Sequence, residues 1–297
     1  MKDLMKNVMD RAEFDIIVIG SGIAGLSYAL TVAEGNPRLQ VAIVTKKERP
    51  DSNTNYAQGG IAATLSPNDT AQMHIDDTLR SGCGLCRVDV VTKIVKLGPR
   101  SVNKLIERGV SFTRSPRKND SSQADLDLAL EGGHSARRVA HAADLTGREI
   151  ERALLEGISA SPNITVFENL IACDALQAVD CAVPTIAGIL AYDSSRSEFR
   201  ELSGKLTMIA TGGVGQVYAH TTNPLIATGD GLAMAFRAGA TVANLEFMQF
   251  HPTAFYEDAD HSFLISEAVR GEGGRLVNGA GHAFMLDYDS RGDLAPR

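Results

Sequence analysis

The sequence predicts an α/β fold, and three features near the amino end carry this prediction. An apolar run of strand length occupies 15–19 and stops at a glycine. A segment with apolar residues at helical spacing follows at once, and a second apolar run of strand length occupies 39–44. The order strand, tight turn, helix, strand begins a βαβ unit, so we expect a Rossmann-like domain that binds a dinucleotide.

Three glycines at the first turn support this expectation, because Gly20, Gly22 and Gly25 have the G-x-G-x-x-G spacing. The first makes the turn, the second lets the main chain approach a pyrophosphate, and the third lets helix and strand pack closely. The same triplet also occurs in glycine-rich turns of other α/β proteins. The second strand ends in Thr45 and Lys46, not in the acidic residue that usually holds a ribose, so a plain NAD site is poorly supported.

The next stretch changes from polar to small residues. Residues 57–63 are mostly small, which fits either a surface loop or main chain lying against a flat ligand. Two apolar stripes at helical spacing between 71 and 112 predict packing helices without chemistry of their own. Residues 114–125 are polar and charged and predict an exposed loop.

Four charged or titratable residues then gather on a glycine turn: Glu131, His134, Arg137 and Arg138. By itself, this pattern is typical of a charged loop exposed to solvent. Asp144 is predicted to cap a helix that runs to about residue 155.

The second half of the chain returns to strand patterns. Residues 163–168 predict a strand, and 171–205 hold two or three short strands that we interpret as an antiparallel insertion. Residues 206–211 predict a separate buried strand that ends in glycines, as expected beneath a nucleotide. Small residues at 227–231 lead into a further helix at 232–236, where main chain can approach a ligand.

Composition excludes several classes of protein. The 297 residues are 44% hydrophobic and 22% charged, which is ordinary for a globular chain. The net charge of −7 argues against broad nucleic-acid binding. No apolar run reaches membrane-spanning length, and the charged first fourteen residues do not form a secretory signal, so a cytoplasmic protein without a membrane partner is expected.

The four cysteines include a C-x-x-C pair, Cys83 and Cys86. This spacing fits a redox pair or half of a metal site. No second C-x-x-C accompanies it, so we expect ordinary reduced thiols and no metal.

Six segments in chain order resemble motifs of the fumarate reductase/succinate dehydrogenase flavoprotein superfamily. They are the glycine turn at 20–25, A-Q-G-G-I at 57–61, A-T-G-G at 210–213, G-D-G at 229–231, Q-F-H-P-T at 249–253 and R-G-E-G at 270–273. Within this superfamily, 53–60 and 131–135 resemble the L-aspartate oxidases. The resemblance implies an FAD-binding domain with an antiparallel β insertion at 1–245 and the start of an α+β capping domain at 246–297.

The resemblance also implies which residues hold the cofactor. Asn53 stands where fumarate reductases usually carry a flavin-linked histidine, so FAD is expected to bind without a covalent bond. Lys46, in place of the ribose acid, matches the aspartate oxidase pattern. The expected cofactor-binding residues are Gly20, Ser21, Gly22, Ile23, Ala24, Gly25, Lys46, Asn53, Thr54, Asn55, Tyr56, Ala57, Gln58, Gly59, Gly60 and Asp230.

Substrate residues follow from the same resemblance. Glu131 is expected to face the α-ammonium of the substrate, and Arg297 to act as the catalytic proton donor and acceptor. His251 is expected as a further catalytic residue that offers a hydrogen bond to a substrate carboxylate, and the remaining substrate contacts are Gln249, Ser266 and Glu267. Taken without the resemblance, His251 and Arg297 fit purely structural roles.

The implied activity is FAD-dependent oxidation of L-aspartate to iminoaspartate. The electron acceptor is O₂, which gives H₂O₂, or fumarate, and the product passes to quinolinate synthase in NAD biosynthesis. The alternatives are a soluble fumarate reductase-like dicarboxylate flavoenzyme, an inactive FAD-binding fragment, and an NAD(P) dehydrogenase. Since the family is considerably longer than this chain, we expect residues 1–297 alone to bind FAD weakly and to oxidise aspartate poorly.

Overall fold

The computed structural model of the protein describes residues 11–115, 126–143, 145–179, 181–251, 253–256, 263–266 and 268–295. The chain divides into two compact units, one of Met1–Tyr56 with Ile150–Gln249 and one of Ala57–Glu149 with Phe250–Arg297. These units are compact groups of contacts and do not test the predicted boundary between an FAD-binding domain and a capping domain after residue 245, which stays a prediction.

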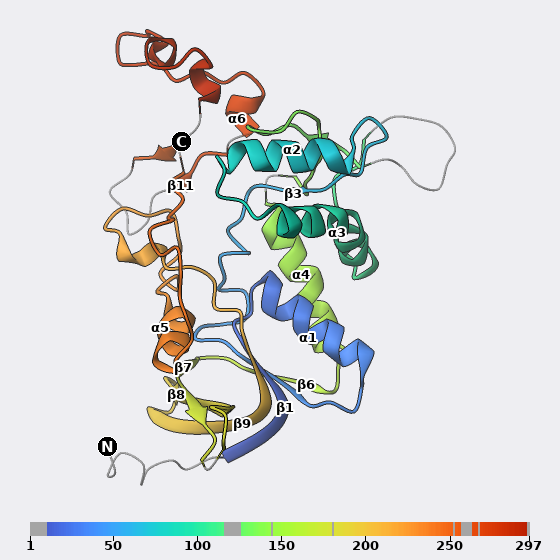
Figure 1. The fold of residues 1–297 in the computed structure, drawn as a ribbon, viewed down its shortest axis with the longest axis vertical. Coiled ribbons are helices and arrows are strands. Elements are labelled where there is room, and N and C mark those ends of the chain that lie inside the picture. Colours follow the sequence, from blue (N-terminus) through green and yellow to red (C-terminus); the bar gives the residue numbers. More distant parts are fainter. Residues whose placement is uncertain are drawn as a thin grey trace. The chain divides into compact units, whose positions relative to one another are not determined.

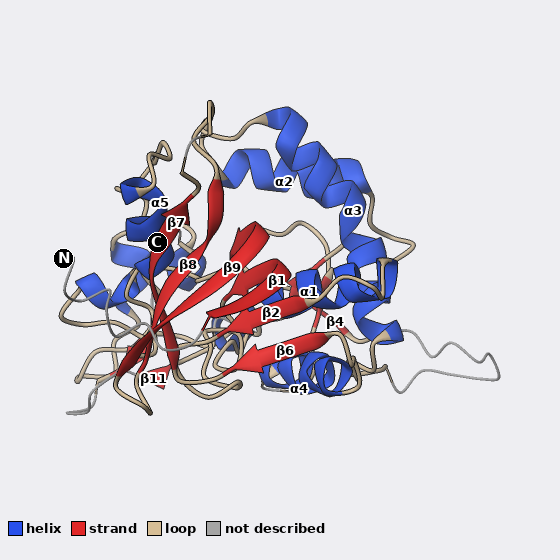
Figure 2. Cartoon of the chain, turned by 90° about the horizontal axis from the view of Figure 1, so that it is seen from below, coloured by secondary structure: helices blue, strands red, loops and turns tan. Residues whose placement is uncertain are grey.

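The first unit is built on a six-stranded sheet, shown in red in Figure 2, with the order β6-β2-β1-β9-β8-β7. Its four parallel strands are β6, β2, β1 and β9, and the antiparallel strands β8 and β7 continue from β9. The bounds are β1 Arg11–Ile19, β2 Val41–Val44, β6 Ile164–Phe167, β7 Leu170–Gln177, β8 Ile186–Asp193 and β9 Glu198–Ile209. A parallel βαβ start with an antiparallel extension is the predicted fold class, which is confirmed.

Strands β1 and β2 have both faces covered. The last four residues of β1 and all four residues of β2 are buried, as expected for a parallel sheet. One side of this sheet contributes Ile17, Ile19, Ala42 and Val44 to a core that also contains Met234. That core therefore supports the carboxyl ends of β1 and β2 from beneath.

The first unit also contains the helices α1 (Ile23–Gly35) and α5 (Asp230–Arg237), and helix α4 (Thr146–Ser159) from Ile150 onward. Helices α1 and α4 are drawn in blue and light green in Figure 1, and a Cβ added to Gly157 would lie 3.3 Å from the Leu30 methyl groups. The absence of a side chain at Gly157 thus lets the two helices approach closely. Helix α5 packs against β7.

One strand differs from the prediction. Residues 198–209 form a single continuous strand, β9, instead of a short insertion strand followed by a separate strand at 206–211. The prediction that 206–211 are buried is also wrong, since Leu206 and Ile209 are exposed. It pairs antiparallel with β8 at its start and parallel with β1 along its second part. Gly204 lies at this change of partner, where an added Cβ would be 2.9 Å from Ile17 Cδ1. Because Gly204 leaves this space open, the strand crosses the sheet without a break, and the insertion extends the main sheet.

Among its described residues, the second unit contains the helices α2, α3 and α6 and two small sheets. Helices α2 (Ala71–Ser81) and α3 (Val88–Glu107) confirm the helical expectation for 71–112, with a break after Ser81 where Cys83 and Gly84 have positive φ angles. The sheet β3-β5-β4 consists of Ile61–Ala62, Val139–Ala140 and Leu128–Ala129. The hairpin β10 and β11 consists of Ala254–Phe255 and Phe263–Leu264, and short helix α6 (Ala268–Gly271) follows.

Two predicted features of the second unit lie outside the described residues. They are the helix cap Asp144 and most of the loop 114–125. Among the residues that the structure describes, no helix combines the length and the apolar character needed to cross a bilayer.

Candidate functional site

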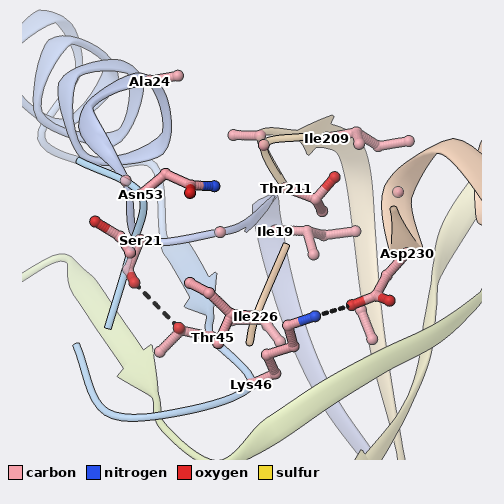
Figure 3. A pocket seen from close by; sticks show the side chains of 18 of the residues that line it. Ile19, Ser21, Ala24, Thr45, Lys46, Asn53, Ile209, Thr211, Ile226 and Asp230 are labelled. Atoms are coloured by element: carbon pink, nitrogen blue, oxygen red, sulfur yellow. Dashed lines mark hydrogen bonds and ion pairs between the residues drawn. The ribbon is translucent and has the colours of Figure 1, made fainter. Parts of the chain in front are cut away.

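The first unit contains a cavity of about 500 Å³ at the carboxyl ends of β1, β2 and β9. Figure 3 shows side chains from the β1–α1 turn, the end of β2, the end of β9 and the start of α5 around it. Since β1 has β2 on one side and β9 on the other, the cavity lies where chain connections diverge, which is the usual ligand position in such sheets. The residues lining it are 19–24, 44–46, 51–54, Leu170, Ala172, 209–212, Ile226, 230–232 and Ala235.

The β1–α1 turn forms one wall of the cavity. Gly20 has a φ of +112°, and its N–H donates to Val44 O at 2.8 Å. A Cβ on Gly25 would overlap the Gly20 carbonyl oxygen and lie 3.2 Å from Val18 Cγ1. The first and third glycines therefore have the geometry of a tight turn and of close helix–strand packing.

Gly22 differs from these two glycines because it lines the cavity directly. The nearest atoms to an added Cβ are Thr54 Oγ1 at 3.2 Å and Ser52 Cβ at 3.9 Å. Thr54 Oγ1 also accepts a hydrogen bond from Ile23 N at 3.0 Å, so one donor of the first turn of α1 is paired with the loop 51–54.

The buried Ser21 hydroxyl joins this turn to the end of β2. It lies 3.0 Å from Arg49 O and 3.0 Å from Thr45 Oγ1, the contact dashed in Figure 3. Since a serine hydroxyl has one proton, Ser21 donates to the carbonyl and accepts from Thr45. This arrangement fixes the turn against the strand end.

An ion pair forms another part of the wall. Lys46 Nζ lies 2.5 Å from Asp230 Oδ2 and 2.6 Å from Thr228 Oγ1, and the pair is visible in Figure 3. The side chains of Lys46 and Asp230 are 24% and 33% exposed, so the pair remains accessible to a ligand or solvent. Two residues predicted to contact the cofactor from distant parts of the chain therefore meet at this cavity.

The loop 51–54 is held from behind by Glu151 on α4. Ser52 Oγ donates to Glu151 Oε1 at 2.8 Å, and Asn55 N donates to Ser52 Oγ at 3.2 Å. Burial raises the pKa of Glu151 to about 7, the Ser52 hydrogen bond opposes this, and the charge of Asp51 adds to it. Glu151 is not among the residues predicted from the sequence, although a glutamate among the apolar positions of α4 is a detectable signal.

The residues around the cavity fit a dinucleotide. Gly22 leaves room for a pyrophosphate beside the amino end of α1, and Lys46 supplies a cation at the cavity wall. No metal-binding group of three or more His, Cys, Asp or Glu side chains occurs among the described residues. The site therefore has the chemistry of an anion-binding cofactor cradle.

Several predicted cofactor residues do not line this cavity. Gly25 lies beneath the turn, and Asn55 and Tyr56 follow the lining loop within the same unit. The remaining ones, Ala57, Gln58, Gly59 and Gly60, belong to the second unit. Their roles stay predictions.

In the second unit, the turn that carries Glu131 is built on a buried charge cluster. Arg138 is 0% exposed and donates from Nε and Nη2 to Asp69 at 2.9 Å each and from Nη1 to Asp77 at 2.7 Å. Asp77 Oδ2 also accepts from Ser135 N at 2.8 Å and from Ser135 Oγ at 2.7 Å. The expectation of a solvent-exposed loop is thus wrong for Arg138, because two aspartates far away in sequence compensate its charge.

Two histidines lie against this cluster, with the His74 and His134 ring centroids 5.7 Å apart. Burial lowers the pKa of both, and the positive charge of Arg138 lowers them further. His134 Nδ1 lies 3.3 Å from Arg138 Nη1, which can only donate, so the neutral ring carries its proton on Nε2.

The predicted substrate residues are spread over both units. In the second unit, a Cβ on Gly59 would lie 3.8 Å from Glu131 Oε1, so these two predicted residues are neighbours. His251 Nδ1 lies 2.8 Å from Thr253 O and donates to it, and Ser266 is half-buried. Gln249 is exposed and ends the first unit, while Glu267 and Arg297 lie outside the described residues.

Known proteins give a consistent comparison. The chain is 47% identical to the chloroplastic L-aspartate oxidase 2-b of Nicotiana tabacum and 45% identical to L-aspartate oxidase 1 of Ralstonia nicotianae. Each match covers 96% of this chain, but 44% and 52% of the respective relative. The chain thus spans about half the length of the curated relatives it matches.

Solved structures agree with this comparison. The FrdA chain of E. coli quinol fumarate reductase superposes with a TM-score of 0.86 at 31% identity, over 94% of this chain and 46% of that chain. Mycobacterium smegmatis Sdh1 gives a TM-score of 0.80 at 32% identity, over 97% of this chain and 49% of that chain.

The family match covers nearly all of the sequence. Residues 15–297 match the model of the family described as FAD binding domain. FAD is accordingly the cofactor of this family of domains and of this chain. The strand order of the sheet and the cavity at the carboxyl ends of its parallel strands agree with this match. The chain belongs to the FAD-binding domain family of flavoproteins.

Proposed function

We propose that the protein oxidises L-aspartate to iminoaspartate with non-covalently bound FAD. The observation that supports this most strongly is the identity of 42–47% to proteins named L-aspartate oxidase over 96–99% of the chain. Asn53 at the cavity wall supports the non-covalent attachment, because an amide side chain does not form the histidine–flavin bond. The acceptor is O₂, which gives H₂O₂, or fumarate, and the product supplies quinolinate synthase in NAD biosynthesis.

The reaction divides the work between cofactor and protein. When bound, FAD accepts the hydride, which no side chain can do. Glu131 pairs with the substrate's α-ammonium and distinguishes an amino dicarboxylate from a plain one. His251 offers a hydrogen bond to a substrate carboxylate, and Gln249, Ser266 and Glu267 complete the proposed substrate contacts.

Arg297 is the proposed proton donor and acceptor. An arginine keeps its proton at ordinary pH because its pKa is above about 12, so neighbouring cations must lower that pKa for it to act as a base.

The discriminating experiment assays the full-length protein with L-aspartate, succinate and fumarate, with and without the substitution Glu131→Gln. We expect aspartate oxidation, measured as peroxide formation or fumarate consumption, to fall by at least about tenfold, because one charge-assisted hydrogen bond contributes about 1.5–3 kcal/mol. Fumarate reduction with an artificial donor should change little. Glu156→Gln, which alters an exposed pair with Arg152, is the matched control.

A second function has specific support. The structural match to quinol fumarate reductase, with a TM-score of 0.86, favours a fumarate reductase-like dicarboxylate flavoenzyme. Succinate–fumarate turnover that exceeds aspartate turnover and ignores Glu131→Gln would establish this alternative. Bound flavin without turnover of either substrate would identify an inactive FAD-binding protein.

A further inference from the structure

Glu151 is a buried carboxylate that does not line the cavity but contacts a residue that does. It is 1% exposed, and its hydrogen-bond partner Ser52 is 5% exposed and lines the cavity. Oε1 accepts the Ser52 hydroxyl, whereas Oε2 has no hydrogen-bond partner among the described residues. A buried carboxylate with one unpaired oxygen is costly when ionised, so this group favours the neutral form.

The contacts of Ser52 connect Glu151 to the cofactor loop. Ser52 Oγ accepts a hydrogen bond from the Asn55 N–H and donates one to Glu151. Glu151 therefore orients Ser52 directly and Asn55 through Ser52, which are the two ends of the segment 52–55. Between these ends lie Asn53 and Thr54, which line the cavity, and Thr54 also pairs with the first turn of α1. Displacing Ser52 would therefore move two cavity-lining residues and a helix-terminal contact together.

We propose that Glu151 is a positioning residue for FAD that holds the 52–55 segment and takes up a proton when the cofactor binds. The pyrophosphate of FAD brings negative charge to a cavity whose wall touches Glu151 through Ser52. An added anion disfavours the carboxylate form of a neighbouring buried glutamate. By linkage, a ligand that favours the protonated form binds more tightly at lower pH.

The charged groups around Glu151 do not compensate the negative charge of its ionised carboxylate. Asp51, from the same loop, adds negative charge and raises the pKa of Glu151, consistent with its value of about 7. The other charged groups on the packed elements are paired or exposed: Arg49 pairs with Glu168 at 3.2 Å, Arg152 with Glu156 at 2.8 Å, and Arg148 and Glu34 are exposed. Among the described residues, the ionisable ones that line the cavity are Lys46, Asp51 and Asp230, and none of these is a histidine.

The first test measures FAD affinity of the chain by fluorescence titration between about pH 6 and about pH 8.5, where FAD itself does not titrate. The wild-type dissociation constant should rise with pH by several-fold, with a limit of roughly tenfold per pH unit for one linked proton. Glu151→Gln mimics the neutral acid and keeps an acceptor, so its affinity should be independent of pH and match that of the wild type at low pH. The control Glu168→Gln alters a more exposed carboxylate that contacts Arg49, just before the segment 52–55, and should keep the wild-type profile.

The second test does not need the cofactor. Hydrogen exchange at the Asn55 amide reports the segment directly, because that N–H is bonded to Ser52. We expect Glu151→Ala and Ser52→Ala to lose this protection and Glu151→Gln to retain it. The proposal would be overturned if FAD affinity depended on pH in Glu151→Gln as it does in the wild type. Full protection of the Asn55 amide in Glu151→Ala would also overturn it.

This inference depends on FAD as the cofactor and is independent of the proposed oxidation of aspartate. Loss of aspartate turnover in the function assay leaves the pH profile of FAD binding unchanged. The two proposals therefore fail in different experiments.

Discussion

The two units of the molecule bury carboxylates in opposite ways. In the second unit, Asp69 and Asp77 enclose Arg138 at 2.7–2.9 Å, and Ser135 supplies two further hydrogen bonds to Asp77. In the first unit, Glu151 has Ser52 as its partner and one oxygen without a hydrogen bond among the described atoms.

The difference appears in the ionisation of the two sites. Burial acts to raise the pKa of Asp77, but hydrogen bonds from Ser135 and Arg138 outweigh it, and the net pKa is lowered. At Glu151 burial dominates and the pKa rises to about 7. Compensated buried charge therefore makes a fixed structural element, whereas uncompensated buried charge responds to pH and to a nearby ligand.

The largest expected effect removes the cation from the compensated cluster. Arg138→Met leaves buried Asp69 without a counter-charge and leaves Asp77 only the exposed Arg80 at 3.4 Å, so it should lower the free energy of unfolding by about 3–5 kcal/mol. The neighbouring substitution Arg137→Met, at a side chain 57% exposed, should change it by less than about 0.5 kcal/mol. Urea unfolding of both variants measures the contrast, and similar losses would mean that the cluster is not specially stabilising.

The next effect concerns the uncompensated site. Because the pKa of Glu151 is raised from 4.5 to about 7, the folded state binds more protons than the unfolded state between these values. This contribution to stability is lost as pH rises through that window, and it amounts to roughly 3 kcal/mol at most. The free energy of unfolding of Glu151→Gln relative to wild type should thus increase between about pH 4.5 and about pH 7.

Protonation of His74 and His134 changes stability with pH in the opposite direction. Subtracting the wild-type free energy of unfolding from that of the variant at each pH removes this shared contribution. A difference that stays flat across the window would show that Glu151 is not titrating there. The same series gives a control in Glu156→Gln, which should follow the wild type throughout.

A smaller effect comes from the histidines beside the compensated cluster. The pKa values of His74 and His134 are lowered, so both are neutral in the folded state, and stability is lost as pH falls through and below their ordinary range. His134→Gln should reduce this acid sensitivity. NMR titration of the ring protons should show both midpoints below the ordinary value of about 6.5, and midpoints above it would contradict the account.

The smallest effect on stability is expected at a partly exposed pair. Lys46→Met removes the contact to Asp230, whose side chain is 33% exposed, and should cost less than about 1 kcal/mol because solvent screens the charges. Its effect on FAD affinity should be larger than its effect on unfolding. A stability loss as large as that of Arg138→Met would remove the distinction between buried and screened pairs.

The sequence predicts local elements better than distant contacts. Strands β1 and β2 and helix α1 follow from apolar spacing and from the glycine turn, and the structure has them within a few residues of the predicted bounds. The continuity of β9 was not predicted, because it depends on how Gly204 packs against a strand far away in sequence. Local patterning does not contain that information.

The candidate site shows the same limit. The glycine turn, Lys46 and Asp230 were predicted from motifs, and the structure brings Lys46 and Asp230 into contact although 184 positions separate them. Arg138 was expected in solvent because its aspartate partners lie 61 and 69 positions earlier. Glu151 was missed because its importance comes from Ser52, which no periodicity connects to it.

The most direct test of the account measures FAD binding to residues 1–297 at about pH 6 for the wild type and for Gly22→Val. A side chain at Gly22 has no main-chain clash and enters the cavity wall beside Thr54, so the fold should survive by circular dichroism. The account predicts a flavin spectral change on binding to the wild type and an affinity at least roughly tenfold weaker for the variant, a difference of about 1.4 kcal/mol. Equal affinity in a folded variant, or no binding of FAD to the wild type, would contradict the claim that this cavity holds the cofactor.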